Sequence, residues 1–187
     1  RPETEELVSL IVKENIIRKK PTILDIGSGS GCIPIGIKSK LPEAEVFSYD
    51  ISMEAVETAR SNADRLEVNV KFDQLDFLDE NAWEDLNGFD IIVSNPPYIP
   101  VAEKAMLDKH VVDFEPNVAL FVPDDDPFIF YRKIKKFAEN HLNEGGRIYL
   151  EVHENYAADV LKIYKPSFPE SRLVRDMYGK ERMVVVE

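Results

Sequence analysis

The chain has 187 residues, 44% of them hydrophobic, and its 23 basic and 35 acidic side chains give a formal net charge of −12 at pH 7. This length and apolar content suit a single domain, predicted to span residues 1–187, with one sizeable core. The negative charge disfavours a protein that binds duplex nucleic acid, because such binding draws most of its non-specific affinity from basic side chains on phosphates.

Apolar periodicity and turn residues predict helices and strands that alternate along the chain. Helices are predicted at 3–19 (within a lead-in segment 1–20), 31–42, 53–66, 126–142 and 154–165. Strands are predicted at 22–26, 45–50, 67–72, 89–94, 147–152, 172–177 and 182–187. Ser52 and Asp126 are the predicted N-caps of the helices that follow them.

This order of elements predicts an α/β fold. Strands separated by helices favour a doubly wound, mostly parallel sheet, here seven-stranded. The last two strands are joined too tightly for a crossover helix, so we expect an antiparallel C-terminal strand. Residues 95–125 form a long irregular stretch, and a loop of that length in a compact domain is usually functional.

The stretch LDIGSGSGC, at 24–32, places glycines directly after the first predicted strand. Glycine lets the backbone turn sharply and approach a ligand closely. The dinucleotide fingerprint needs a further glycine where Cys32 stands, and no Gly-Lys-Ser/Thr follows, so NAD binding and a P-loop are both disfavoured. A purely structural turn is the alternative interpretation.

Polar side chains also follow the next two predicted strands. Asp50 closes the second strand, where an acid can accept hydrogen bonds from ribose hydroxyls. Asp76 follows the third and could accept from an adenine amino group, while Phe77 or Leu78 could cover the ring. The plainer alternatives are surface acids and core side chains. The chain order nevertheless places all of these residues at strand ends, where ligands bind in this architecture.

The stretch VSNPPYIP, at 93–100, ends the fourth predicted strand with an amide, two prolines and an aromatic ring. Proline lacks a donor N–H and cannot continue a central strand, so one interpretation is a simple terminating turn. The functional interpretation is a stiff turn that presents the Asn95 side-chain amide and the Tyr98 ring.

The remaining composition bounds the type of site and the compartment. The histidines lie far apart without ligand spacing, so no metal site is predicted. A single cysteine fits a reducing cytosol, and we expect a cytoplasmic protein. No run of eighteen apolar residues occurs, so no membrane span is expected. The start RPETEE, without Met, is typical of a fragment.

Two motifs together resemble one enzyme class. The run from Asp25 to Gly31 resembles the cofactor-binding motif of class I S-adenosylmethionine-dependent methyltransferases, and NPPY is similar to the motif of the amino-methyltransferases among them. The longer pattern resembles the release-factor glutamine methyltransferases of HemK/PrmC type, whose members carry an N-terminal helical domain ahead of RPETE. The matching stretches are 1–8, 24–35, 50–63, 89–100, 114–120, 130–134 and 179–187.

The resemblance implies a reaction and a set of site residues. The reaction is S-adenosylmethionine-dependent N5-methylation of the glutamine in the Gly-Gly-Gln motif of a class I peptide chain release factor, with S-adenosylhomocysteine as product. No direct nucleic-acid or membrane partner is expected. The implied catalytic residues are Asn95, Pro96 and Tyr98. The implied cofactor-binding residues are Asp25, Gly27, Ser28, Gly29, Ser30, Gly31, Asp50, Ile51, Asp76, Phe77, Leu78 and Asn95. The implied substrate-binding residues are Thr4, Asn95, Pro96, Pro97 and Tyr98.

Two other functions remain open at this point. An adenine-N6 methyltransferase of DNA or RNA would use the same chemistry, with Tyr98 stacked on a flipped base. Its drawbacks are the net charge of −12 and the absence of an obvious basic recognition region in the sequence. A catalytically silent nucleoside-binding scaffold is the third reading, and the intact stretch from Asn95 to Tyr98 argues against it.

Overall fold

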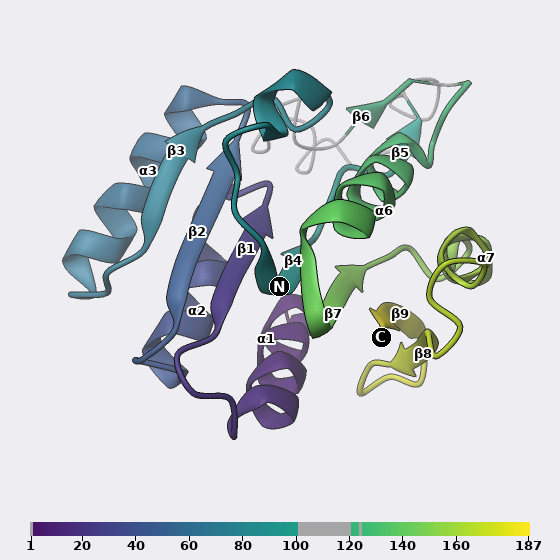
Figure 1. Cartoon of the computed structure of the whole chain (residues 1–187), viewed down its shortest axis with the longest axis horizontal. Helices are drawn as coiled ribbons and strands as arrows, with labels where there is room; N and C mark the ends of the chain where they lie inside the picture. The colour runs from purple at the N-terminus through teal and green to yellow at the C-terminus, as the bar shows by residue number, and fades with distance from the viewer. Residues whose placement is uncertain (1, 101–120, 124) are drawn as a thin grey trace.

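The computed structural model describes residues 2–100, 121–123 and 125–187. Within these residues a seven-stranded sheet, in the order β3-β2-β1-β4-β7-β9-β8, forms the middle layer of the molecule (Figure 1). Its strands are β1 (Thr22–Ile26), β2 (Glu45–Asp50), β3 (Lys71–Gln74), β4 (Phe89–Ser94), β7 (Leu142–Glu151), β8 (Arg172–Arg175) and β9 (Glu181–Val186). Strand β9 pairs antiparallel with β7 and β8, and the other pairings are parallel, which confirms the predicted fold class.

Helices cover both faces of the sheet. The described helices are α1 (Pro2–Asn15), α2 (Cys32–Lys40), α3 (Met53–Arg65), α6 (Ile129–His141) and α7 (Ala157–Tyr164), with a short 3₁₀ helix η1 (Glu80–Trp83). Side chains alternate between the faces along each strand. In β4, Val93 therefore packs with α1 and α2, whereas its neighbour Ile92 packs with α6 and α7. Both faces of the parallel strands are buried, as this architecture requires.

The predicted loop 95–125 is described only at its two ends. Strand β5 (Ile99–Pro100) pairs in parallel with β6 (Phe121–Val122) in a separate two-stranded sheet. Residues 101–120 lie outside the described part of the chain.

The predicted limits of three of the seven strands are confirmed, and those of β8 and β9 differ by one or two residues. The limits of β1, β2 and β4 are those predicted, and Ser52 caps α3 by accepting from the Ala55 N–H at 3.3 Å. Strand β7 is longer than predicted, because it begins at Leu142 rather than after the glycine pair. Its pairing with β4 is irregular between Phe89 and Ile91, which accommodates the extra residues.

The predicted third strand, 67–72, is wrong in its position. The strand is Lys71–Gln74, and the residues before it close helix α3 instead. The Val68 N–H donates to the Ala63 carbonyl at 2.9 Å, and Glu67 has a φ of 55°. A left-handed residue with a helix-capping hydrogen bond cannot also pair in a sheet.

One end of each of two predicted helices is also wrong. The helix predicted at 3–19 ends at Asn15, where the chain turns and the Arg18 N–H donates to the Asn15 carbonyl at 3.0 Å. Asp126 is not the N-cap of α6, because that helix begins at Ile129 with Phe128 in the cap position. Asp126 forms an ion pair with Arg132 instead.

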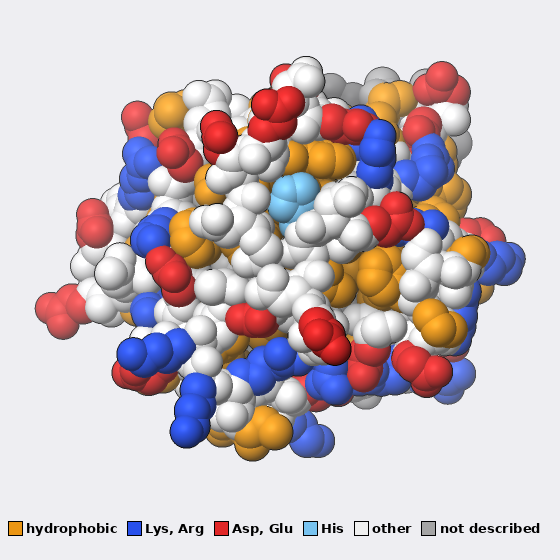
Figure 2. All heavy atoms as spheres, viewed as in Figure 1, with side chains coloured by type: hydrophobic (Ala, Val, Ile, Leu, Met, Phe, Trp, Pro, Cys, Tyr) orange, Lys and Arg blue, Asp and Glu red, His pale blue; other side chains and the backbone are white. Residues whose placement is uncertain are grey.

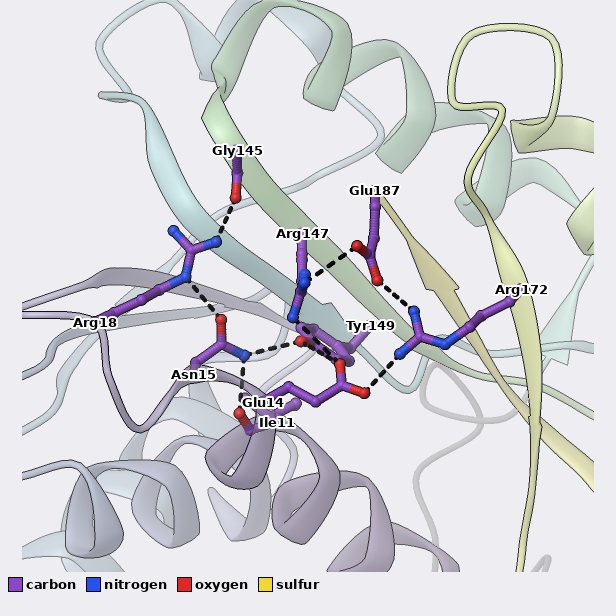
Figure 3. Close-up of polar contacts among 9 residues, drawn as sticks. All are labelled: Ile11, Glu14, Asn15, Arg18, Gly145, Arg147, Tyr149, Arg172 and Glu187. Carbon is purple, nitrogen blue, oxygen red and sulfur yellow. Dashed lines mark hydrogen bonds and ion pairs between the residues drawn. The ribbon is translucent and has the colours of Figure 1, made fainter.

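The C-terminal end of α1 is fastened to the sheet by a polar network (Figure 3). Asn15, fully buried, donates to the Tyr149 hydroxyl at 2.8 Å, and that hydroxyl donates to Glu14 at 2.9 Å. Glu14 also pairs with Arg172 of β8 at 2.6 Å. Burial raises the pKa of Tyr149 to about 12, so it stays a neutral donor. The other members drawn are Ile11, Arg18, Gly145, Arg147 and Glu187.

Candidate active site

The glycine loop follows β1 at the carboxyl edge of the sheet. Gly27, Gly29 and Gly31 have φ values of 89°, 52° and 84°, which residues other than glycine rarely adopt. A Cβ added to Gly27 or Gly29 would meet nothing within 4 Å, whereas one added to Gly31 would lie 2.8 Å from Ile35 Cδ1. The first two glycines therefore border open space where a ligand could approach the backbone, and the third packs against the core. Ser30 is exposed beside them.

Asp25 lies beneath this loop and is fully buried. The Ser48 hydroxyl donates to Asp25 Oδ2 at 2.6 Å, and the Ser28 hydroxyl lies 2.6 Å from that of Ser48. Asp25 Oδ1 is buried without a hydrogen-bond partner. Burial raises the pKa of Asp25 to about 8; the Ser48 hydrogen bond opposes the rise and the charge of Asp50 adds to it. An orphaned buried carboxyl oxygen beside an open glycine loop fits a site completed by a polar or cationic ligand group.

Asp50 ends β2 and holds the loop in place. Its Oδ2 accepts from the Gly29 N–H at 3.0 Å, and its Oδ1 accepts from the Ser52 N–H at 2.9 Å. Each carboxylate oxygen has a second lone pair, so Asp50 can still accept from a ligand hydroxyl. Ile51 follows with a side chain that is 45% exposed, and its carbonyl accepts from Gln74 at 2.8 Å.

The third predicted cluster is only partly suited to the predicted role. Asp76 is exposed and accepts from the Leu78 N–H at 2.9 Å, and Leu78 is half-buried. Phe77 is only 5% exposed, and its ring lies 5.3 Å from Trp83 and 5.2 Å from Phe137. The suggestion that the Phe77 ring covers a nucleobase is therefore wrong, because that ring belongs to the core. The Leu78 side chain and the Asp76 carboxylate remain as candidates.

The turn from Asn95 to Tyr98 starts beside the glycine loop. Ile26 of β1 and Ser94 of β4 are register partners, and the Ser94 hydroxyl donates to the Ile26 carbonyl at 2.7 Å. The next residues, Gly27 and Asn95, therefore begin the two loops side by side at the carboxyl edge of the sheet. This is the topological position at which open α/β sheets bind ligands.

The burial of this turn fits a preorganised pair of acceptors. Pro96 is buried, whereas Asn95, Pro97 and Tyr98 are half-buried. The Tyr98 ring packs against the core, with its centroid 5.7 Å from that of His153. Burial and the ring contact hold the turn in one arrangement, as a preorganised site requires.

Thr4 lies close to this edge, but not as an exposed substrate contact. It is 9% exposed, and its hydroxyl donates to Glu151 Oε2 at 2.9 Å. Sequence reasoning missed Glu151 and His153 as residues of this region. Their signal was available in principle, because they follow the apolar run of β7 and the carboxyl ends of parallel strands share one edge.

The surface view in Figure 2 shows charges of both signs around the rim of the molecule. Its upper edge carries several acidic side chains and some Lys and Arg, and its lower edge carries many Lys and Arg together with further acidic side chains. A surface hollow of about 510 Å³ lies at the other end of β7, bordered by Leu142, Arg147 and Glu187, and its lining includes no residue of the glycine loop or of the Asn95–Tyr98 turn. Among the described residues, no set of three or more His, Cys, Asp or Glu side chains is arranged to hold a metal.

In the described part of the chain, no helix is long and apolar enough to span a bilayer.

Comparison with known families defines the class of protein. The methyltransferase domain family matches residues 17–173, so the chain belongs to that family. Two solved structures share the fold over the whole chain, each with a TM-score of 0.69. TrmN from Thermus thermophilus is 20% identical, with 51% of its length covered, and a ribosomal protein L11 methylase from Lactobacillus delbrueckii subsp. bulgaricus is 18% identical, with 79% covered.

Closer relatives identify the particular family. Proteins named release factor glutamine methyltransferase are 42% identical over 98% of this chain in Bacteroides thetaiotaomicron, 44% identical over 100% in Flavobacterium psychrophilum and 40% identical over 100% in Lactococcus lactis subsp. lactis. The chain spans 66%, 66% and 68% of their lengths, or about two thirds. It belongs to the release factor glutamine methyltransferase family.

Proposed function

We propose that this protein transfers a methyl group from S-adenosylmethionine to the side-chain amide nitrogen of a glutamine, in the Gly-Gly-Gln motif of a class I release factor. The observation that carries the proposal is the register of β1 and β4, which begins the glycine loop and the Asn95–Tyr98 turn side by side. A donor held by the loop and an acceptor held by the turn would then meet. The family of the chain supports this choice of acceptor.

The residues around the loop fit the cofactor. The open space at Gly27 and Gly29 would receive it, Asp50 would accept from its ribose hydroxyls, and Asp76 and Leu78 would bind its base. The buried oxygen of Asp25 would face its positive charge. When bound, S-adenosylmethionine supplies an electrophilic methyl group on a sulfonium sulfur, which needs no acid catalyst.

The Asn95–Tyr98 turn would orient and activate the nucleophile, which is the glutamine amide nitrogen. A glutamine amide nitrogen is a poor nucleophile, because its lone pair is delocalised into the carbonyl. The Asn95 Oδ1 and the Pro96 carbonyl would accept its two N–H groups, which aims the lone pair along the line of transfer. Tyr98 would stack on the amide plane and face the positive charge that develops on nitrogen. The methylated amide is acidic enough to lose its extra proton to water.

The nucleic-acid alternative is not favoured. The relatives at 42% and 44% identity carry the name of a release factor glutamine methyltransferase, and the chain has a formal net charge of −12. An enzyme that flips bases out of a duplex also has to hold the phosphates on both sides.

The test is a methyl-transfer assay with labelled S-adenosylmethionine and three acceptors: a folded class I release factor, its Gln→Ala variant at the Gly-Gly-Gln motif, and duplex DNA. We expect label only on the unaltered factor. Label on DNA would refute the glutamine acceptor but would not affect the proposal for the cofactor site. The longer relative from Bacteroides thetaiotaomicron is the appropriate parallel sample.

Asn95→Ala is the matched variant for the chemistry. Removing one of two acceptors should lower turnover by about a hundredfold or more, by analogy with loss of one oxyanion-hole donor. Most of the affinity for S-adenosylhomocysteine should remain, because the glycine loop and Asp50 would supply most of the cofactor contacts. Equal loss of binding and turnover would refute the assignment of Asn95 to the acceptor.

A further inference from the structure

The end of β7 holds a carboxylate that the proposed chemistry does not use. Glu151 is only 5% exposed. Carboxylates are seldom buried unless they are hydrogen-bonded or paired, because burial removes their hydration. Thr4, 147 positions earlier in the chain, donates its hydroxyl to Glu151 Oε2 at 2.9 Å. The buried Tyr131 hydroxyl donates to the Glu151 backbone carbonyl at 3.2 Å, so both the side chain and the backbone are held.

The register places this carboxylate beside the acceptor turn. Ser94 of β4 is the partner of Leu150 of β7 in a parallel pairing. The next residues, Asn95 and Glu151, therefore lie on neighbouring chains at the same edge, where adjacent strands are about 4.8 Å apart. Glu151 follows Tyr149 by two positions and so points to the same face, the one covered by α1.

We propose that Glu151 is a positioning residue for the acceptor: through Thr4, it fixes the first turn of α1 as a wall of the pocket that receives the glutamine amide beside Asn95. The inference rests on the proposed function, because it concerns the same acceptor. Sub-ångström placement decides the rate of such a transfer, and a helix end that can shift would widen the pocket.

The far end of α1 is already fastened by the network of Asn15 and Tyr149, about 16 Å away along the helix from Thr4 by the rise per residue. That network stabilises the docking of the helix but does not contact the carboxyl edge. A separate hydrogen bond at Thr4 is therefore what sets the helix end next to the site. The two anchors of one helix provide the controls for the test.

The experiment measures kcat and KM for the folded release factor, and the affinity for S-adenosylhomocysteine, in four variants and the unaltered chain. Thr4→Val removes the hydroxyl but keeps the shape, and Thr4→Ser restores it. Glu151→Ala removes the acceptor, and Glu151→Gln keeps an oxygen that can accept. We expect Thr4→Val and Glu151→Ala to lower kcat/KM for the factor by about tenfold or more, the loss of one buried hydrogen bond to a charged group.

Thr4→Ser and Glu151→Gln should retain most of the activity, and S-adenosylhomocysteine affinity should stay within about twofold in all four. A Thr4→Val/Glu151→Ala double variant should lose clearly less than the sum of the two single losses, since both substitutions break the same hydrogen bond. Tyr149→Phe is the control for docking of α1 in general: it should lower stability and leave kcat/KM near that of the unaltered chain.

Three results would overturn the assignment. The first is additive losses in the double variant. The second is a Glu151→Gln variant as impaired as Glu151→Ala, which would mean that the charge and not the hydrogen bond matters. The third is a Tyr149→Phe variant as slow as Thr4→Val, which would reduce Thr4 to a general structural role. An unaltered chain that methylates no release factor would instead overturn the proposed function, and with it this use of Glu151.

Discussion

The same substitution at two glycines of the loop should have different main effects. Gly29 and Gly31 both have positive φ, but a Cβ at Gly29 would meet nothing within 4 Å. At Gly31 it would lie 2.8 Å from Ile35 Cδ1 and 3.2 Å from Ala59 Cβ. We predict that Gly31→Ala mainly lowers stability and that Gly29→Ala mainly lowers the affinity for the cofactor.

The magnitudes follow from these contacts. An alanine in the left-handed region costs about 1–2 kcal/mol at either position. Gly31→Ala adds a forced shift of buried Ile35 and of Ala59, worth about 1–3 kcal/mol of overpacking. The free energy of unfolding should therefore fall by about 2–5 kcal/mol for Gly31→Ala and by about 1–2 kcal/mol for Gly29→Ala.

The assays are urea unfolding for stability and calorimetric titration with S-adenosylhomocysteine for affinity. The added methyl group of Gly29→Ala would occupy the open space of the loop. The dissociation constant of this variant for S-adenosylhomocysteine should therefore rise by about tenfold or more, which is a loss of about 1.4 kcal/mol in binding free energy. The affinity of folded Gly31→Ala should change less. The reasoning is refuted if both variants lose the same stability, or if Gly29→Ala binds as tightly as the unaltered chain.

Two further predictions concern buried polar groups. The unfolded chain loses the Asp25 proton near pH 4, whereas the folded chain keeps it to about pH 8, so unfolding releases a proton between these values. The unaltered chain should thus lose stability relative to Asp25→Asn as pH rises through this window, by up to about 1.4 kcal/mol per pH unit in urea unfolding; parallel pH curves would contradict the buried neutral carboxyl. Tyr149→Phe removes the hydroxyl that contacts Asn15 and Glu14 and should lower the free energy of unfolding by about 1–3 kcal/mol. Lys162→Ala, at an exposed ion pair, should change it by less than about 0.5 kcal/mol, and equal effects of the two would refute the network's contribution.

Local patterns were sufficient for the central strands and the two loops that define the site. The apolar runs of β1 and β4 end at the predicted residues, because a buried parallel strand reads as a short continuous apolar segment. The glycine loop was readable because positive φ requires glycine, and the turn after Ser94 because proline ends a central strand. The order of these features also placed them at one edge of the sheet.

Edges and ends of elements were harder to predict. Strand β3 has only four residues at the border of the sheet, and its position depends on pairing with β2 rather than on its own pattern. The prediction of Asp126 as a helix cap was wrong for a similar reason. Several polar residues precede α6, and the Asp126 carboxylate forms an ion pair with Arg132. Short-range propensity is too weak to decide between such alternatives.

The sequence by itself determined the parallel α/β sheet, the glycine loop and the turn from Asn95 to Tyr98, since each depends on residues that are adjacent in the chain. The tertiary structure alone decided what those residues face. It sent the Phe77 ring into the core, left an oxygen of buried Asp25 without a partner, and joined Thr4 to Glu151 across 147 positions. Burial, pKa and long-range hydrogen bonds depend on packing between distant segments, and no local pattern encodes them.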